Sequence, residues 1–191
     1  MGFYDGMSLD SVKGSSYDVA RTLGLPVIFV INARGAAMTL AAMVKGIVEF
    51  RPDSNIRGIL LNRVSAMLYP RLKEMLENEL ARIGHDEIKI VGYMPENEAF
   101  HLESRHLGLV TPQEMENLQE KVRQAGEILT KTVDLELLEQ IAGEAAVWKA
   151  EISEESEKIG SLKSLNYPVR IAVARDEAFC FYYKDNFELL E

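Results

Sequence analysis

The sequence predicts an α/β fold built on a doubly wound parallel sheet, and three short apolar segments carry that prediction. Val27–Asn32, Ile56–Asn62 and Ile88–Tyr93 are apolar at consecutive positions, which is typical of strands covered on both faces. Segments with apolar residues at helical spacing lie between them. They are Ala36–Phe50, with Leu40, Met43, Val44 and Ile47 expected on one apolar face, and Tyr69–Ile83. Alternation of strand and helix predicts right-handed crossovers between parallel strands.

Start and stop signals mark the other predicted helices. Before the first strand, Ser15–Leu23 is expected to be helical, with Ser15 or Ser16 as its N-cap and "GLP" at its end. The segment "TPQEMENL", which begins at Thr111, combines an N-cap, a proline at the first helical position and a capping box. Asp134 is expected to begin the next helix.

The character of the chain changes near residue 148, and three regions are expected. Residues 1–148 would form the main α/β unit, residues 149–168 an acidic, serine-rich linker, and residues 169–191 the start of a second α/β domain. The last region opens with a predicted strand, Val169–Ala174, and continues into a short helix. One strand and one helix cannot bury a core, so this second domain is expected to be truncated.

Composition narrows the classes of function. The 191 residues carry a formal net charge of −9, which argues against a basic groove for nucleic acid or an anionic membrane. No apolar run approaches the ~20 residues that span a bilayer, and no signal peptide opens the sequence. The single cysteine, Cys180, excludes an internal disulfide and a cysteine-based zinc site. These features predict a cytoplasmic protein in which Cys180 is a small buried residue.

Polar residues follow each predicted strand, where ligands bind in open parallel sheets. Asn62 ends the second strand, and its amide offers a donor and an acceptor, as an adenine edge does; alternatively it satisfies its own loop backbone. Residues 32–35, "NARG", either bind an anion at a helix start or form a plain turn with Arg34 in solvent. Arg105 and His106 either hold a phosphate or carboxylate or belong to a leucine-packed loop.

Two further observations concern phosphates and metals. The sequence has no G-x-x-x-x-G-K-[ST] and no G-x-G-x-x-G motif, so the phosphate-binding loop of a nucleotide enzyme would lie outside it. His85 and His101 have no spacing that indicates a metal site.

The opening "MGFYDG" is a turn with no element before it, so Asp5 is either a surface turn residue or part of a site.

Several of these segments together resemble the cobyrinic acid a,c-diamide synthases. They are "MGFYDG", "GSSYDVARTLGLPVIFVINARG", "GILLNRV", "MPENEAFHLESRHLGLV" and "VRIAVARDEAFCFYYKDNFELLE", in order and over nearly the whole chain. The resemblance implies a P-loop-type ATP domain, similar to dethiobiotin synthetase, followed by a class I glutamine amidotransferase domain. It also implies that ATP and Mg²⁺ activate the a and c carboxylates of a corrinoid as acyl phosphates, which ammonia from glutamine converts to amides in cobalamin biosynthesis.

The resemblance assigns expected roles to five residues. It implies that Asp5 is a catalytic carboxylate near the carboxylate being activated and that Asn62 recognises adenine. Pro95 would lie in the loop that lines the same pocket, while Arg105 and His106 would help to close it. No metal ligand is assigned, because the acidic ligand of the family would precede the first residue.

The sequence also departs from the family pattern. Asn32 stands where many relatives have aspartate, which removes a carboxylate from that strand end. The family's first strand and phosphate-binding loop would precede Met1, and its glutaminase cysteine would follow Glu191. The chain is therefore interpreted as a fragment, inactive alone, whose incomplete sheet favours self-association. Two alternatives remain: a nickel-sirohydrochlorin a,c-diamide synthase with the same chemistry, and a non-catalytic protein-interaction module of the same fold.

Overall fold

The structure is a computed structural model in two units. It describes residues 2–97, 100, 104–105, 108–109, 117–147, 170–176, 179 and 182–190. The larger unit comprises Met1–Leu109 and Asn117–Trp148, and the smaller one comprises Val110–Glu116 and Lys149–Glu191. The three regions expected from the sequence, 1–148, 149–168 and 169–191, stay a prediction.

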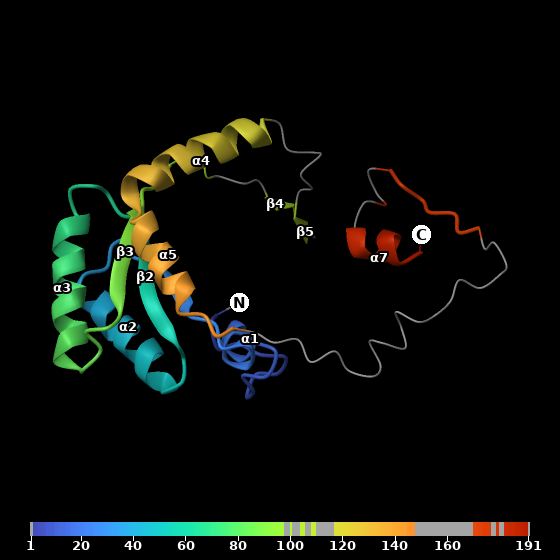
Figure 1. Ribbon diagram of the computed structural model, residues 1–191. Coiled ribbons are helices and arrows are strands. Elements are labelled where there is room, and N and C mark those ends of the chain that lie inside the picture. The colour runs from blue at the N-terminus through green and yellow to red at the C-terminus, as the bar shows by residue number, and fades with distance from the viewer. Residues whose placement is uncertain are drawn as a thin grey trace. The chain divides into compact units, whose positions relative to one another are not determined.

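Three parallel strands form the centre of the larger unit (Figure 1). The strands β1 (Val27–Asn32), β2 (Ile56–Asn62) and β3 (Lys89–Met94) are hydrogen-bonded in the order β1–β2–β3. The helix α2 (Met38–Phe50) joins β1 to β2, and α3 (Tyr69–Arg82) joins β2 to β3. Both helices lie on one face of the sheet, as right-handed crossovers in a single direction require. The predicted α/β fold with a parallel sheet is confirmed.

On the opposite face, the chain that follows β3 contacts β2 and β3. It forms α4 (Leu118–Thr132) and α5 (Leu135–Gly143). The junction of these helices crosses β3 at Gly92, where a Cβ atom would lie 2.5 Å from the Thr132 carbonyl oxygen. Gly92 has a φ of +150°, so both the space and the backbone angle require glycine there.

The crossing is fixed by hydrogen bonds on either side of it. The register of β3 against β2 shifts at Val91, and the Val91 carbonyl accepts a hydrogen bond from the Asp134 backbone N–H at 2.8 Å. The Asp134 side chain accepts one from the Leu137 N–H at 3.0 Å and so caps α5. The predicted start of this helix at Asp134 is confirmed.

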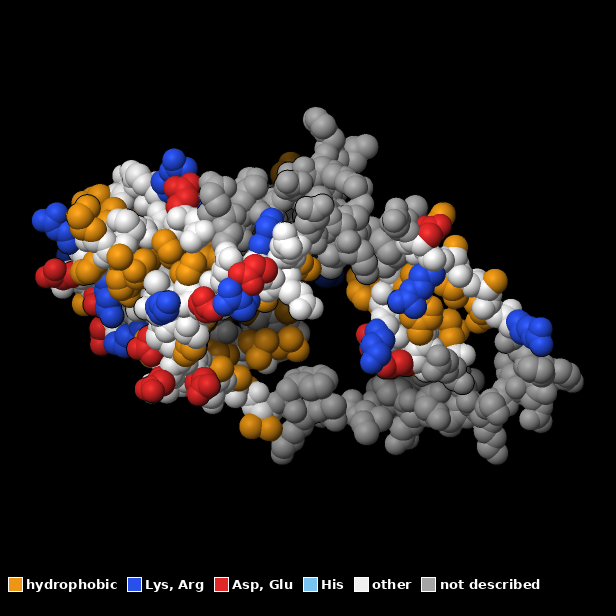
Figure 2. Space-filling model, turned by 90° about the horizontal axis from the view of Figure 1, so that it is seen from above, with side chains coloured by type: hydrophobic (Ala, Val, Ile, Leu, Met, Phe, Trp, Pro, Cys, Tyr) orange, Lys and Arg blue, Asp and Glu red, His pale blue; other side chains and the backbone are white. Residues whose placement is uncertain are grey.

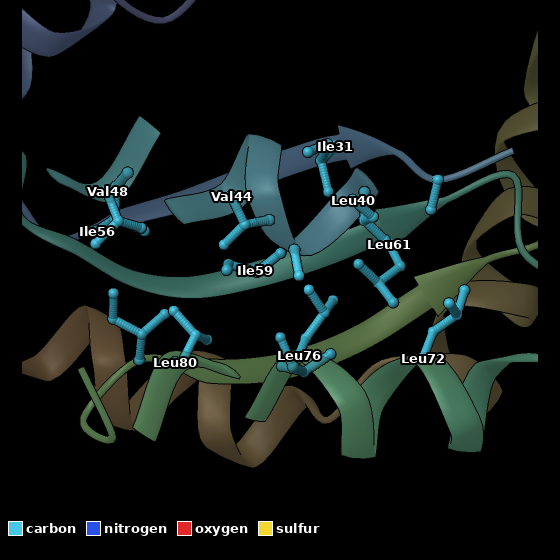
Figure 3. Close-up of a cluster of buried hydrophobic side chains, with 14 of the residues drawn as sticks. Ile31, Leu40, Val44, Val48, Ile56, Ile59, Leu61, Leu72, Leu76 and Leu80 are labelled. Carbon is cyan, nitrogen blue, oxygen red and sulfur yellow. The ribbon is translucent and has the colours of Figure 1, made fainter. Parts of the chain in front are cut away.

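The core lies between the sheet and the layer of α2 and α3, where side chains from both interdigitate (Figure 3). Its most deeply buried large side chains are Leu40, Ile59, Leu61, Leu76, Leu80 and Ile90. Two expectations were wrong in detail. Met43 of α2 is 48% exposed, because the buried stripe runs through Leu40, Ala41, Val44 and Val48. Strand β1 is not covered on both faces: Val30 is 54% exposed, since α5 lies against β2 and β3.

The first helix, α1 (Ser16–Leu23), ends as the sequence predicts. The Ser15 hydroxyl accepts a hydrogen bond from the Asp18 N–H at 3.2 Å, which makes Ser15 the N-cap. Gly24 takes a left-handed conformation with a φ of +64°. Its N–H and that of Leu25 bond to carbonyls of the last helical turn, a common helix C-terminus.

The remaining described elements are short. The strands β4 (Ser104–Arg105) and β5 (Gly108–Leu109) pair antiparallel, and α7 (Lys184–Leu190) belongs to the smaller unit. The strand predicted at Val169–Ala174 was wrong for its described part, because residues 170–175 pair with no described strand. The helix cap predicted at Thr111 lies outside the described residues. Among the helices of the described part, none is both long and apolar enough to cross a membrane.

Candidate functional site

The carboxyl ends of the three strands form one polar edge. In the register of the sheet, Asn32 lies opposite Asn62, and Asn62 lies opposite Met94. The loops that follow are linked, because the Ala33 N–H donates to the Asn62 carbonyl at 2.9 Å and the Val64 N–H to the Met94 carbonyl at 3.2 Å. We call residues 32–34, 62–64 and 94–96 the carboxyl edge.

Both asparagines of this edge are held in the same way. The Asn32 Oδ1 atom accepts a hydrogen bond from the Arg34 backbone N–H at 3.2 Å, and the Asn62 Oδ1 atom accepts one from the Arg63 N–H at 3.0 Å. A backbone N–H selects the amide oxygen, so each amide keeps its Nδ2 donors for other partners. The expected bond of Asn62 to its own loop is therefore present, while adenine recognition stays a prediction.

Charged side chains stand beside these amides. Arg34 Nη1 lies 3.0 Å from Glu96 Oε1, and so an ion pair joins the loop after β1 to the loop after β3. Arg63 has a φ of +61° and an exposed side chain. It forms no ion pair with any residue that the structure describes. Such a φ costs a non-glycine residue free energy and is enriched at functional sites.

No role was predicted for Arg63 or Glu96 from the sequence. The available signal was their position: Arg63 directly follows the end of β2, and Glu96 comes two residues after the end of β3. Charges of the two signs are interspersed on the face of the molecule that Figure 2 shows. Among the described residues, the carboxyl edge is distinguished by amide hydrogen-bond donors that have no partner.

Asp5 lies in the N-terminal turn, and its carboxylate is exposed. Asp5 Oδ2 accepts a hydrogen bond from the Gly2 N–H at 2.6 Å. The neighbouring aromatic residues are packed: the rings of Phe3 and Phe29 are centred 6.0 Å apart, and Tyr4 donates to the Ile47 carbonyl at 2.7 Å. Within the described residues no hydrogen bond or ion pair joins Asp5 to the carboxyl edge, so its catalytic role stays a prediction.

The other predicted site residues fall partly within the described chain. Pro95 is half-buried and directly follows Met94, the β3 partner of Asn62, so Pro95 and Asn62 share the carboxyl edge. The backbone of Arg105 pairs with Gly108 in the β4–β5 hairpin. The side chain of Arg105, and His106 as a whole, lie outside the described residues. In the described part, no three His, Cys, Asp or Glu side chains gather as a metal site would require.

A cavity of about 320 Å³ lies at the opposite end of the sheet, beside the turns that enter β2 and β3. Several polar residues that line it are bonded within the fold, whereas the buried Arg57 Nε atom has no hydrogen-bond partner among the described residues and lies 3.5 Å from Glu144 Oε2. Asn55 donates to the Leu25 carbonyl at 2.6 Å, and the His85 ring lies 3.0 Å from a Glu87 carboxylate oxygen. Burial works to raise the pKa of Glu87, but the His85 ring and nearby backbone and charges hold that pKa below its usual value. This cavity belongs to the fold's own polar network.

Two tyrosines extend that network. The Tyr17 hydroxyl donates to Asp53 Oδ1 at 2.7 Å. This hydrogen bond, then burial and the charge of Asp53, raise the pKa of the Tyr17 phenol. Burial is also the main reason that the pKa of Tyr4 is raised. The raised pKa of Tyr17 thus reflects a phenol that donates to a carboxylate of the protein itself, and the raised pKa of Tyr4 mainly reflects burial.

Comparison with known proteins identifies relatives along the whole chain. The chain is 38% identical over 191 residues to the cobyrinate a,c-diamide synthase of Clostridium tetani. It is 37% identical over 190 residues to that of Clostridium acetobutylicum and 37% identical over 195 residues to that of Fusobacterium nucleatum. The chain is homologous to the cobyrinate a,c-diamide synthases. The resemblance carried by the five sequence segments is thereby confirmed.

Coverage of the relatives is partial. Each alignment includes 100% of this chain, but only 39%, 40% and 43% of the three synthases. The chain thus spans about two fifths of the length of the curated relatives it matches. No protein-family model matches it, and no solved structure does.

Proposed function

We propose that this chain serves in the ATP- and glutamine-dependent amidation of the a and c side-chain carboxylates of cobyrinate, in cobalamin biosynthesis. The observation that carries the proposal is its match, end to end, to synthases named for that diamide product. An amide cannot form from an unactivated carboxylate at a useful rate in water. ATP would convert the carboxylate to an acyl phosphate, which is reactive enough for attack by ammonia derived from glutamine.

The carboxyl edge supports a place for ATP. Asn62 keeps its Nδ2 donors free of described partners, and its Oδ1 retains a second lone pair beside the bond to Arg63. These are the groups that pair with an adenine edge, which also presents a donor and an acceptor. Pro95, one residue beyond the β3 partner of Asn62, would lie against the base.

Asp5 supports a place for Mg²⁺. Magnesium uses one or two protein carboxylates and completes its shell with phosphate oxygens and water. Asp5 is exposed, and its Oδ1 atom has no partner among the described residues while Oδ2 bonds to Gly2. Asp5 would therefore provide one ligand to a metal that neutralises the phosphates of ATP during phosphoryl transfer.

Isothermal titration of the full chain with ATP and Mg²⁺, and separately with adenosine, tests the proposal. We expect Asn62→Ala to weaken binding of both ligands about tenfold, equal to about 1.4 kcal/mol. The matched control is Asn78→Ala, which removes an exposed amide from the solvent face of α3 and leaves both affinities unchanged. Absence of binding to the unaltered chain, or equal affinities in the two variants, would overturn the role of Asn62.

A further inference from the structure

We propose that Arg34 is an anion-binding residue of the carboxyl edge, held across Asn62 by Glu96 until a phosphate or carboxylate of the ligand takes the place of Glu96. This inference rests on the proposed function. It deepens that function by naming the residue that receives the anionic group and the residue that competes with it.

The position of the ion pair is the first argument. Arg34 follows β1 and Glu96 follows β3, while β2 lies between these strands. A contact of 3.0 Å between Arg34 Nη1 and Glu96 Oε1 therefore has to span the end of β2, where Asn62 lies. We therefore expect a ligand bound to the amide of Asn62 to lie beside this pair.

The strength of the ion pair is the second argument. The side chains of Arg34 and Glu96 are 63% and 55% exposed. Exposed pairs contribute roughly 0–1 kcal/mol, because water competes and both side chains lose freedom. A ligand phosphate or carboxylate, which binds a guanidinium through two parallel hydrogen bonds, can therefore replace Glu96 at little cost in stability.

The charge balance of the edge is the third argument. Glu96 is the one carboxylate within residues 32–34, 62–64 and 94–96. The other polar side chains there are donors: the amides of Asn32 and Asn62, whose oxygens are engaged, and two guanidiniums. Once Glu96 is displaced, the edge has no carboxylate to repel an anion, and its amide and guanidinium N–H groups can donate to it. Gly35, next to Arg34, has no atom within 4 Å of a Cβ built on it, so the neighbouring backbone has open space around it.

The test measures affinity of the full chain for tripolyphosphate and for acetate by NMR titration. Glu96→Gln keeps the shape of the side chain and removes the competing charge. We expect it to tighten tripolyphosphate binding about fivefold, the upper end of what an exposed pair contributes. Arg34→Gln is expected to weaken that binding about tenfold, as loss of a charge-assisted hydrogen bond does. The double variant should bind as weakly as Arg34→Gln alone.

A matched control separates the local effect from net charge. Glu49→Gln removes the same charge from an exposed ion pair, Lys45–Glu49, in the last turn of α2, and should leave both affinities unchanged. Equal tightening by Glu49→Gln and Glu96→Gln would overturn the inference. So would a double variant that still binds more tightly than Arg34→Gln, because Glu96 would then act without Arg34.

The two probes identify the source of the anion. Stronger dependence of tripolyphosphate binding on Arg34 assigns the residue to the phosphates of ATP, and stronger dependence of acetate binding assigns it to the carboxylate being activated. Adenosine carries no anion, so its affinity should depend on Asn62 and not on Arg34. Adenosine binding that depends on Asn62, combined with no effect of either Arg34 or Glu96 on anions, would overturn this inference and leave the proposed function intact.

Discussion

The polar side chains at the two ends of the sheet differ in whether their donors are hydrogen-bonded within the fold. At the amino end, the donors of Tyr17 and Asn55 are bonded within the fold, to Asp53 and to the Leu25 carbonyl. At the carboxyl edge, the amide nitrogens of Asn32 and Asn62 have no partner among the described residues, and both amide oxygens serve only their own loops. The first arrangement stabilises the fold, and the second leaves donors for a ligand.

Backbone strain follows the same division. Asn55 and Arg63 both have a positive φ, of 53° and 61°. Asparagine adopts this region readily, and Asn55 also gains a hydrogen bond there. Arg63 gains no ion pair with a described residue, and its backbone N–H bonds to the neighbouring Asn62 Oδ1. The cavity at the amino end is a poorer candidate for function than the carboxyl edge, because its Asn55 and Asp53 side chains are hydrogen-bonded within the fold.

Truncation of one side chain at each end should show the largest contrast. Tyr17 is 3% exposed and bonded to Asp53, so Tyr17→Ala should lower the free energy of unfolding by about 3 kcal/mol. Asn62→Ala removes one local hydrogen bond at a partly exposed position and should lower the free energy of unfolding by less than ~1 kcal/mol. Urea denaturation followed by circular dichroism measures both values. Similar losses for the two variants would remove the contrast between the ends.

Glycine substitution of the two strained residues should act with opposite sign. Arg63→Gly relieves a backbone cost of ~1–2 kcal/mol, less the flexibility that glycine adds to the unfolded chain, so stability should rise by about 0.5–1 kcal/mol. Asn55→Gly removes the bond to the Leu25 carbonyl and should lower stability by about 1 kcal/mol. The same denaturation experiment compares them. A loss of stability in Arg63→Gly would show that Arg63 is a structural residue.

Local patterns in the sequence were sufficient for most of the fold. The bounds predicted for β1 and β2 match the structure, because buried parallel strands are short apolar segments bounded by polar turns. The third strand begins one residue later than predicted, at Lys89. Ile88 is apolar and buried, but its N–H donates to the His85 carbonyl in the preceding turn. Hydrophobicity identified Ile88 as a core residue and could not show where its hydrogen bond goes.

The site was predictable only where it depends on local position. The asparagine at the end of β2 was identifiable, since strand ends in a parallel sheet form one edge. The pair of Arg34 and Glu96 joins residues 62 positions apart, and Tyr17 and Asp53 are 36 apart. No periodic pattern links such positions, because each pair depends on the packing of whole strands and helices. The same holds for the crossing of the α4–α5 junction over Gly92.

Alkaline pH should produce the smallest effect and test the amino end most directly. The bond to Asp53, burial and the nearby charge raise the pKa of the Tyr17 phenol above its ordinary value near ~10. A pKa that is higher in the folded state gives stability that is complete below the ordinary value and is lost as pH rises through the folded value. The urea midpoint of the unaltered chain should therefore fall above pH ~10.

Tyr17→Phe removes the part of this fall that is due to Tyr17 and leaves the part due to Tyr4, whose pKa is raised by burial. Tyr183→Phe, which removes a phenol that is 78% exposed, controls for the loss of one tyrosine. If the midpoint of Tyr17→Phe falls as steeply as that of the unaltered chain, the bond between Tyr17 and Asp53 does not stabilise the amino end.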